Sequence, residues 1–412
     1  MGVVKKLLSR PRKAVDVAPE ILMDPMTQPR IYLDHAATTW PKPEAVYAEM
    51  DRYAREVGAA AGRGAYAEAM EGERLVRRCR ADIAALLGES EPERIVFTQN
   101  GTDSLNMTIH GLLRPGDHVV TTVCEHNSVL RPLRFHQQKR DVRITYVRCD
   151  GEGFVSPDDI TAAILPGTRL IAMLHASNVT GAIQAAEEVG RIAAEREIPF
   201  LLDAAQSLGH FPISAKALHQ PLIAAPGHKG LLGPLGTGIL YVPPGMENRL
   251  ASFRQGGTGT RSDEDLQPTS LPDKYESGNL NVPGVVGLGE GVRAVAASDL
   301  GASLEKERTL CGRLLSGLSE IPGLTLYGPK NTDHRLGVVS FNLAGFEPQE
   351  LAALLDSAYH IQVRAGIHCA PRMHQTLGTS PRGTVRMSIS PHSTTEADID
   401  AAITAVGEVA AG

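Results

Sequence analysis

The sequence predicts an α/β protein. We expect a large domain with a mostly parallel, mixed sheet sandwiched by helices, followed by a smaller α+β domain at the C-terminus. From about Arg94 onward, short apolar runs typical of strands alternate with amphipathic stretches typical of helices. After about residue 322 this alternation gives way to a few short strands and helices. The length of 412 residues also exceeds that of one usual domain.

Five apolar runs predict the strands of the large domain, and each is followed by a polar or amphipathic stretch. They are residues 94–97, 118–122, 143–147, 169–174 and 198–202. Ser156 and Pro157, followed by two aspartates, predict the start of one intervening helix. Serine caps a helix N-terminus, proline is tolerated in the first turn, and acidic residues complement the helix dipole.

Helical spacing of apolar residues over 283–321 predicts one long helix that leads into the small domain and ends at Pro322 and Gly323. For the small domain we expect strands over 338–343 and 384–389, a helix over 347–357, and a last helix opened by a capping box from Ser393 to Glu396. The predicted domains are a flexible extension over 1–30, a large domain over 31–285 and a small domain over 286–412.

Composition excludes several classes of function. With 42% hydrophobic residues, 21% charged residues and a net charge of -6, the chain is typical of soluble globular proteins and indicates no nucleic acid partner. No apolar run reaches the roughly 18 residues that a membrane-spanning helix needs. The five cysteines include no CxxC pair, so we expect no disulfide framework, no metal site and a cytoplasmic location. Residues 1–30 do not fit a secretory signal, and their acidic residues make them a poor fit to a transit peptide.

Two residues near strand ends are candidates for chemistry. Asp203 directly follows a predicted buried strand, where a carboxylate needs a partner, although it could also serve as a helix cap or in an internal ion pair. Lys229 lies in a glycine-rich, almost uncharged segment. Burial there would lower the pKa of its ammonium group and yield the neutral amine that attacks an aldehyde. A structural lysine is the alternative.

Residues 97–106 follow a strand and open a helix, so the backbone N–H groups of Gly101 and Thr102 could bind a phosphate, although glycine at a strand end is often only a turn. A phosphate cradle, an amine and a strand-end carboxylate are together what pyridoxal 5'-phosphate (PLP) requires. His126 also follows a strand and could stack on the cofactor ring and move protons near neutral pH. Otherwise it is a core or surface histidine.

Cys369 lies between two predicted elements of the small domain, close in sequence to Arg364 and His368. Cationic neighbours favour a thiolate, which makes Cys369 a candidate nucleophile. Most cysteines, however, are simply buried small apolar residues, and we interpret the other four in this way.

These residues together resemble the class V aminotransferase fold family, and within it the cysteine desulfurases and selenocysteine lyases with a short cysteine loop. The resemblance runs from about Ile31 to the C-terminus. Its most specific motifs are Tyr32-Leu-Asp-His-Ala-Ala-Thr-Thr, Glu125-His-Asn-Ser, His175-Ala-Ser-Asn-Val-Thr-Gly, Asp203-Ala-Ala-Gln-Ser, Gly227-His-Lys, Arg364-Ala-Gly-Ile-His-Cys-Ala and Thr384-Val-Arg. The resemblance implies fold type I of the PLP-dependent enzymes and a homodimer.

The resemblance also implies roles in binding the cofactor. Lys229 would hold PLP as a Schiff base, Asp203 would pair with the pyridine nitrogen, and Gln206 would donate to the phenolic oxygen of the ring. His126 would cover the ring face and act in catalysis. Asn178 is implied to contact the cofactor as well.

For the substrate, the resemblance implies binding by Asn178, Arg364 and Arg386. Asn178 and Arg386 would hold the substrate carboxylate, which suits the planar guanidinium group. Cys369 would be the nucleophile that takes the sulfur.

The phosphate group would be bound by Gly101, Thr102 and His228, with a contribution from the 276–279 loop of the neighbouring subunit, which carries Asn279. Three positions depart from the pattern of the family. Pro226 stands where a serine or threonine usually binds phosphate, and it offers neither a hydroxyl nor an N–H group. Asn279 replaces a common threonine, and Tyr66 stands where some desulfurases have a histidine.

The sequence therefore predicts a PLP-dependent cysteine desulfurase. It would convert L-cysteine to L-alanine and hold the sulfur on Cys369 as a persulfide for an acceptor protein, for example in iron–sulfur cluster assembly. One alternative is another reaction of the family: a selenocysteine lyase, a sulfinate lyase, an aminotransferase or an epimerase. A second alternative is a PLP-binding sulfur-transfer scaffold with little turnover, which Pro226 favours.

Overall fold

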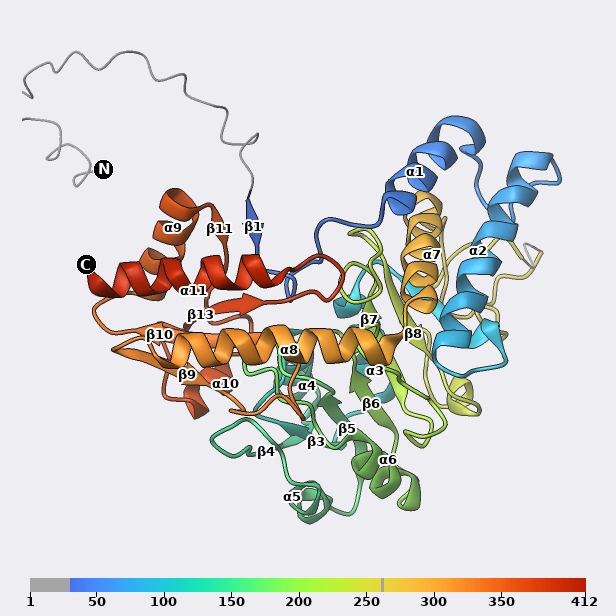
Figure 1. Ribbon diagram of the computed structural model, residues 1–412. Coiled ribbons are helices and arrows are strands. Elements are labelled where there is room, and N and C mark those ends of the chain that lie inside the picture. The colour runs from blue at the N-terminus through green and yellow to red at the C-terminus, as the bar shows by residue number, and fades with distance from the viewer. Residues whose placement is uncertain (1–29, 261–262) are drawn as a thin grey trace, which may run out of the picture.

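The computed structural model describes residues 30–260 and 263–412, so the predicted extension over 1–30 lies almost entirely outside the described residues. The strands of the large domain are β2 (Ile95–Thr98), β3 (His118–Thr122), β4 (Arg143–Val147), β5 (Thr168–Leu174), β6 (Phe200–Asp203), β7 (Leu222–Pro226) and β8 (Gly238–Tyr241). They form one seven-stranded sheet in the order β2-β8-β7-β6-β5-β3-β4 (Figure 1). Strand β8 is antiparallel to β2 and β7, and the other pairs are parallel. The predicted mostly parallel, mixed sheet is confirmed.

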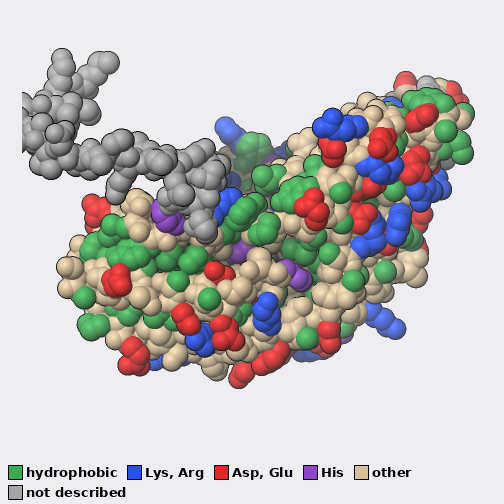
Figure 2. Space-filling model, turned by 45° about the horizontal axis from the view of Figure 1, so that its top comes forward, with side chains coloured by type: hydrophobic (Ala, Val, Ile, Leu, Met, Phe, Trp, Pro, Cys, Tyr) green, Lys and Arg blue, Asp and Glu red, His purple; other side chains and the backbone are tan. Residues whose placement is uncertain are grey.

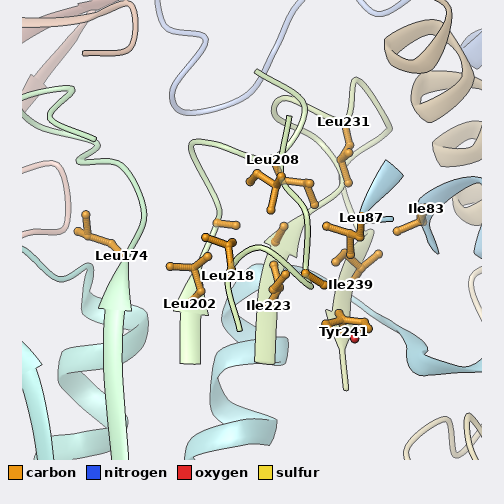
Figure 3. Packing of buried hydrophobic residues seen from close by; sticks show 14 of the residues in the cluster. Ile83, Leu87, Leu174, Leu202, Leu208, Leu218, Ile223, Leu231, Ile239 and Tyr241 are labelled. Atoms are coloured by element: carbon orange, nitrogen blue, oxygen red, sulfur yellow. The ribbon is translucent and has the colours of Figure 1, made fainter. Parts of the chain in front are cut away.

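Helices cover both faces of this sheet, because successive side chains of a strand point to opposite sides. The helices are α1 (Glu44–Arg52), α2 (Ala67–Leu86), α3 (Gly101–Leu112), α4 (Asn127–Arg140), α5 (Pro157–Ala163), α6 (Ala186–Glu195) and α7 (Val282–Ala297), with short helical turns η2 (Tyr53–Val57), η3 (Pro92–Arg94) and η4 (Met246–Asn248). Leu201 belongs to the buried cluster that includes α3 and α4, whereas Leu202 belongs to the cluster that includes α2, α5, α6 and α7. In the second cluster Leu202, Ile223 and Ile239 lie on three neighbouring strands (Figure 3).

Two predicted helix boundaries were wrong. The expected single helix over 283–321 is two helices, α7 and α8 (Leu300–Ser319). Asp299 separates them, because its side chain accepts hydrogen bonds from the first backbone N–H groups of α8 and so starts a new helix. The last helix, α11 (Glu396–Ala411), is opened by a capping box of Thr395 and Asp398, two residues beyond the predicted box.

The small domain contains a four-stranded antiparallel sheet in the order β12-β13-β10-β9, formed by β9 (Leu324–Tyr327), β10 (Val338–Leu343), β12 (Arg364–Gly366) and β13 (Thr384–Ser388). Helices α8, α9 (Pro348–Tyr359), α10 (Pro371–Thr376) and α11 belong to the same half of the molecule (Figure 1). Strand β1 (Ile31–Tyr32) pairs with β11 (Ile361–Gln362), and Leu33 is buried in the small-domain cluster. Helix α7 packs in the buried cluster of the large domain, and α8 packs in that of the small domain. The predicted domain boundary between residues 285 and 286 stays a prediction.

An ion pair links the two halves of the molecule. Nδ1 of His210, beyond β6, lies 2.8 Å from Oε2 of Glu307 on α8, and the Glu307 side chain is buried. Its other carboxylate oxygen accepts a hydrogen bond from the backbone N–H of Gly337. Burial by itself lowers the pKa of His210, but the charge and the hydrogen bond of Glu307 outweigh burial and raise it.

The surface carries acidic and basic side chains interspersed across the face shown in Figure 2. Among the helices in the described ranges, none is long and apolar enough to cross a membrane. The same residues contain no group of three or more histidine, cysteine, aspartate or glutamate side chains placed to hold a metal ion.

Candidate active site

A cavity of about 210 Å³ lies where the carboxyl ends of the parallel strands meet the small domain. It brings together most of the predicted site residues from both halves of the chain. Those that line it are Gly101, Thr102, His126, Asn178, Asp203, Gln206, His228, Lys229, Arg364 and Arg386. Pro226 lines it as well, whereas Cys369 and Asn279 do not.

Asp203 lies at the end of β6 in this cavity, and Lys229 lies in the turn that follows the neighbouring strand β7. Asp203 is the last residue of β6, and its Oδ1 accepts a hydrogen bond of 3.0 Å from the backbone N–H of Ala205. Burial raises the pKa of Asp203, and the positive charge of Lys229 opposes this rise. Burial lowers the pKa of Lys229 to about 8, although the charge of Asp203 opposes it. The lowered pKa favours the neutral amine, as the apolar sequence around Lys229 predicted.

The backbone at His228 and Lys229 is fixed by the segment that follows β1. The carbonyl of His228 accepts hydrogen bonds from the backbone N–H of Thr39 at 3.1 Å, from Oγ1 of Thr38 at 3.1 Å and from Nζ of Lys42 at 2.6 Å. Oγ1 of Thr39 donates to the carbonyl of Lys229 at 3.0 Å. Sequence analysis missed Lys42, because nothing in the local pattern shows that it reaches a residue 186 positions away.

The start of α3 packs tightly against the end of β7. Asn100 caps the helix with its side chain, and a Cβ atom added to Gly101 would lie only 3.1 Å from Cδ of Pro226. Glycine is therefore the residue that lets the first N–H groups of α3 approach the cavity wall this closely. Oγ1 of Thr102 lies 2.7 Å from Oγ of Ser128, which ties α3 to the start of α4.

His126 forms the N-cap of α4. Its Nδ1 accepts a hydrogen bond of 3.1 Å from the backbone N–H of Ser128, so Nε2 carries the proton in the neutral ring. Burial lowers the pKa of His126 to about 4, and the charges of Lys229 and Arg364 contribute. Burial and these two cations, which the sequence did not reveal, therefore favour the neutral imidazole, and a role of His126 in moving protons stays a prediction.

The loop that carries Cys369 is attached to the cavity by its backbone. His368 and Cys369 have φ angles of 47° and 58°, which non-glycine residues rarely adopt in succession. The side-chain amide of Asn178 donates to the His368 carbonyl at 2.7 Å, and the backbone N–H of Asn127 donates to the Cys369 carbonyl at 2.7 Å. Nη2 of Arg364 lies 3.8 Å from Sγ of Cys369. These bonds hold a half-buried thiol beside the cavity without placing it in the wall.

Arg386, on β13, is fully buried at the small-domain side of the cavity. Its Nη2 pairs with Oδ1 of Asp34 at 2.5 Å, and its Nη1 donates to the carbonyl of Asn178 at 3.1 Å. Burial lowers the pKa of Arg386, and Asp34 opposes the effect. Its Nε is buried and has no hydrogen-bond partner among the described residues.

Asn279 is exposed, on a loop that begins at a buried ion pair. The side chains of Arg80 and Glu276, 7% and 6% exposed, lie 2.7 Å apart. Glu276 also accepts a hydrogen bond of 2.6 Å from the backbone N–H of Phe97 on β2. The loop is thus fixed to the sheet while Asn279 faces outward. Tyr66, 56% exposed, does not line the cavity either.

A sequence profile of the family described as aminotransferase class-V matches residues 31–401. The chain belongs to this family. A probable cysteine desulfurase of Methanothermobacter thermautotrophicus is 36% identical to this chain over 379 residues, which cover 90% of this chain and 93% of that protein. A probable cysteine desulfurase of Pyrococcus abyssi is 34% identical over 379 residues, which cover 90% of this chain and 92% of that protein.

Solved structures agree with the class-V assignment. The apo structure of a cysteine desulfurase from Thermococcus onnurineus NA1 aligns with a TM-score of 0.87 and 34% identity, covering 93% of this chain and 95% of that chain. The cysteine desulfurase CsdA from Escherichia coli, in an S-sulfonic acid form, aligns with a TM-score of 0.83 and 28% identity, covering 93% and 94%. The resemblance inferred from the motifs is confirmed.

The class-V aminotransferase family uses PLP in general, and the cavity residues fit this cofactor. Asp203 offers a carboxylate to a pyridine nitrogen, and Lys229 offers an amine of lowered pKa to an aldehyde. Nδ1 of His228 is buried and has no hydrogen-bond partner in the described part of the chain. A buried polar atom without a partner is costly, so His228 is suited to a contact with a bound group.

Proposed function

We propose that the protein is a PLP-dependent cysteine desulfurase that converts L-cysteine to L-alanine and holds the sulfur on Cys369 as a persulfide. One observation carries the proposal. The loop bearing Cys369 is hydrogen-bonded to Asn127 and Asn178, at the edge of the cavity that contains Lys229 and Asp203. A thiol beside a PLP-type site is what sulfur abstraction needs. The names of the relatives support the same reaction.

The cofactor contacts follow from the cavity wall. Lys229 would hold the aldehyde carbon, Asp203 the pyridine nitrogen and Gln206 the phenolic oxygen, with His126 over the ring. The phosphate would be held by residues at the start of α3 and before the lysine, namely Gly101, Thr102 and His228. When bound, PLP supplies an electron sink for charge that develops at the substrate Cα.

The substrate carboxylate fits between Arg386 and Asn178. The Nη atoms of Arg386 are already bonded to Asp34 and to the Asn178 carbonyl, which fixes the guanidinium plane, while Nε remains available among the described groups. A fixed guanidinium orients a carboxylate without losing rotamer freedom on binding. Arg364 supplies a second positive charge in the same cavity.

Proton and sulfur transfer fall to Lys229 and Cys369. Once the substrate amine has displaced it, Lys229 with its pKa of about 8 is partly neutral near neutral pH, so its Nζ can take the proton from the substrate Cα. The Cys369 thiolate then bonds to the substrate sulfur while the substrate C–S bond breaks, and the electron pair of that bond stays with carbon. Lys229 returns its proton to Cα, and the proton that Cys369 lost on becoming a thiolate goes to Cβ, which completes alanine and leaves S–SH on Cys369. Nη2 of Arg364, 3.8 Å from Sγ of Cys369, contacts the attacking sulfur.

Replacing the nucleophile tests the proposal. Cys369→Ala should lower alanine and sulfide production from L-cysteine by at least about 10³-fold, because it removes the thiol that we propose accepts the sulfur. The absorbance of bound PLP should not change, because Cys369 does not line the cavity. Cys149→Ala is the matched control and should keep its turnover. Full desulfurase activity of Cys369→Ala would contradict the proposal, and activity kept with selenocysteine alone would indicate a selenocysteine lyase.

We further propose that the protein is a homodimer in which the loop with Asn279 reaches the phosphate group in the partner subunit. Support comes from the exposed position of Asn279 on a loop that the Arg80–Glu276 pair fixes to the sheet. Light scattering should give twice the chain mass of 44.0 kDa. Asn279→Ala should weaken PLP binding in a dimer of unchanged mass, and a monomeric, fully active enzyme would contradict the idea.

We also propose that the persulfide sulfur on Cys369 passes to an acceptor protein.

A further inference from the structure

Two cysteines outside the proposed mechanism lie side by side at the ends of β3 and β4. These parallel strands are in register through Thr122 and Val147, and the backbone N–H of Val123 continues the ladder to the Val147 carbonyl at 3.0 Å. Two residues beyond that register are Cys124 and Cys149. Both cysteines lie just past the ends of their strands, with Cys124 in a turn. The strands that lead into them run about 4.8 Å apart, a spacing within the roughly 4.4–6.8 Å between the Cα atoms of disulfides.

The two thiols contact each other and differ in exposure. The Cys124 and Cys149 thiols are close enough for each to shift the pKa of the other, while the S–H of Cys124 donates to the Gly153 carbonyl. Cys124 is fully buried, with its Sγ 3.7 Å from the Gly153 carbonyl, whereas Cys149 is partly exposed. Sγ of Cys149 also lies 3.9 Å from Sδ of Met373. A small reagent can therefore reach the Cys149 thiol, whereas the Cys124 thiol is buried.

We propose that Cys124 and Cys149 form a site of reversible oxidation that closes to a disulfide by exchange with a low-molecular-weight disulfide, RSSR. The Cys149 thiolate attacks one sulfur of RSSR, which gives a mixed disulfide and releases RS⁻. The Cys124 thiol, after losing its proton, attacks the Cys149 sulfur and releases the second RS⁻. The two cysteines lose two electrons and two protons, and RSSR gains them to become two RSH.

The different surroundings of the two thiols support this order of events. Interaction with Cys124 lowers the pKa of the partly exposed Cys149, although burial opposes the effect, while interaction with Cys149 and burial raise the pKa of Cys124. The partly exposed thiol is thus the one whose thiolate is favoured, and thiolates are the attacking species in exchange. The buried thiol is unreactive until its neighbour has been modified.

The disulfide would lie between two parts of the candidate site. Cys124 is followed directly by Glu125, His126 and Asn127, whose backbone holds the Cys369 carbonyl. On the other side, Met373 belongs to α10, the helix that follows the Cys369 loop. Glu125 is fully buried and joins this region to β5, since its Oε1 accepts hydrogen bonds from Thr122 and from the backbone N–H of Leu174. The pair is therefore a redox-sensitive contact next to the nucleophile loop, independent of the reaction proposed for it.

Peptide mapping tests the inference without any activity measurement. The full-length protein with bound PLP is equilibrated in buffers of increasing ratio of oxidised to reduced glutathione, alkylated, digested without reduction and analysed by mass spectrometry. We expect a linked peptide pair containing Cys124 and Cys149, and a fall from five alkylated thiols to three. Dithiothreitol should reverse both changes.

Variants assign the link. Cys149→Ala should abolish it, as should Cys124→Ala if that protein folds, whereas Cys369→Ala should keep it. The buried Cys311 offers a control, since Cys311→Ala should also form the link. Five alkylated thiols at every glutathione ratio would overturn the inference, and so would a link that joins Cys149 to Cys369 instead of Cys124.

Discussion

Replacing Pro226 with serine should tighten the binding of PLP. Pro226 is the last residue of β7, is buried and lines the cavity, where a Cβ on Gly101 would meet its ring at 3.1 Å. It therefore stands beside the first turn of α3, where we place the phosphate. Proline offers no donor there, whereas serine brings a hydroxyl and a backbone N–H.

The expected gain follows from a single hydrogen bond to a charged group. Such a bond contributes about 1.5–3 kcal/mol, and we take about 1.5 kcal/mol because the serine side chain must give up its rotamer freedom. At about 1.4 kcal/mol for each factor of ten, the dissociation constant of PLP should fall about tenfold. The substitution also removes the packing of the proline ring on Gly101 and frees the unfolded chain, so the folded protein should lose roughly 0.5–1 kcal/mol of stability.

Pro226→Ala separates the gain in PLP binding from the loss of stability. Alanine loses the proline ring packing and the restriction of the unfolded chain, as serine does, but it brings no hydroxyl. The cofactor is removed from all three proteins, and PLP is titrated back while its absorbance is followed. The serine variant should bind about tenfold more tightly than the alanine variant. If serine binds no more tightly than alanine, the phosphate does not lie beside residue 226 and the reasoning is refuted.

Two further predictions concern stability. His210→Asn should lower the melting temperature most in acid. Glu307 raises the pKa of His210 in the folded protein above the unfolded value of about 6.5. The stabilisation of the folded protein by this ion pair is therefore complete below about pH 6.5 and is lost as the pH rises through the raised pKa. Thermal unfolding of both proteins across this range checks it, and a difference that grows with pH would be evidence against the pair. Arg80→Met should cost about 3 kcal/mol in chemical unfolding, because it leaves the Glu276 carboxylate buried and uncompensated. Arg77→Met, at a side chain 78% exposed, should cost less than about 1 kcal/mol, and equal losses for the two variants would contradict the argument.

Local patterns predicted much of the large domain and its cavity. Apolar runs located β2 to β6, and polar residues directly after them, such as Asp203 and His126, meet at one end of the sheet because parallel strands end together. The position of Lys229 in a glycine-rich, uncharged segment correctly indicated a lowered pKa. These features depend on residues close in sequence, which is why the sequence alone could predict them.

Features that depend on distant contacts were not predictable. The Cys369 loop is held by Asn127 and Asn178, and the Lys229 backbone by residues that follow β1. The pKa of His126 is set by burial and by cations from other segments. The break between α7 and α8 is a different kind of miss, because Asp299 carries a local capping signal that the strong apolar periodicity on both sides concealed.

The path of the chain sets the time at which the cavity closes during synthesis. β1 pairs with β11, and Asp34 pairs with Arg386. During synthesis Asp34 therefore has no partner until the ribosome has added 352 further residues. Until then Lys229 and Asp203 stand in an open groove without their small-domain wall. A chain that lacks residues 361–386 thus has no closed cavity and lacks Cys369, the nucleophile that we propose.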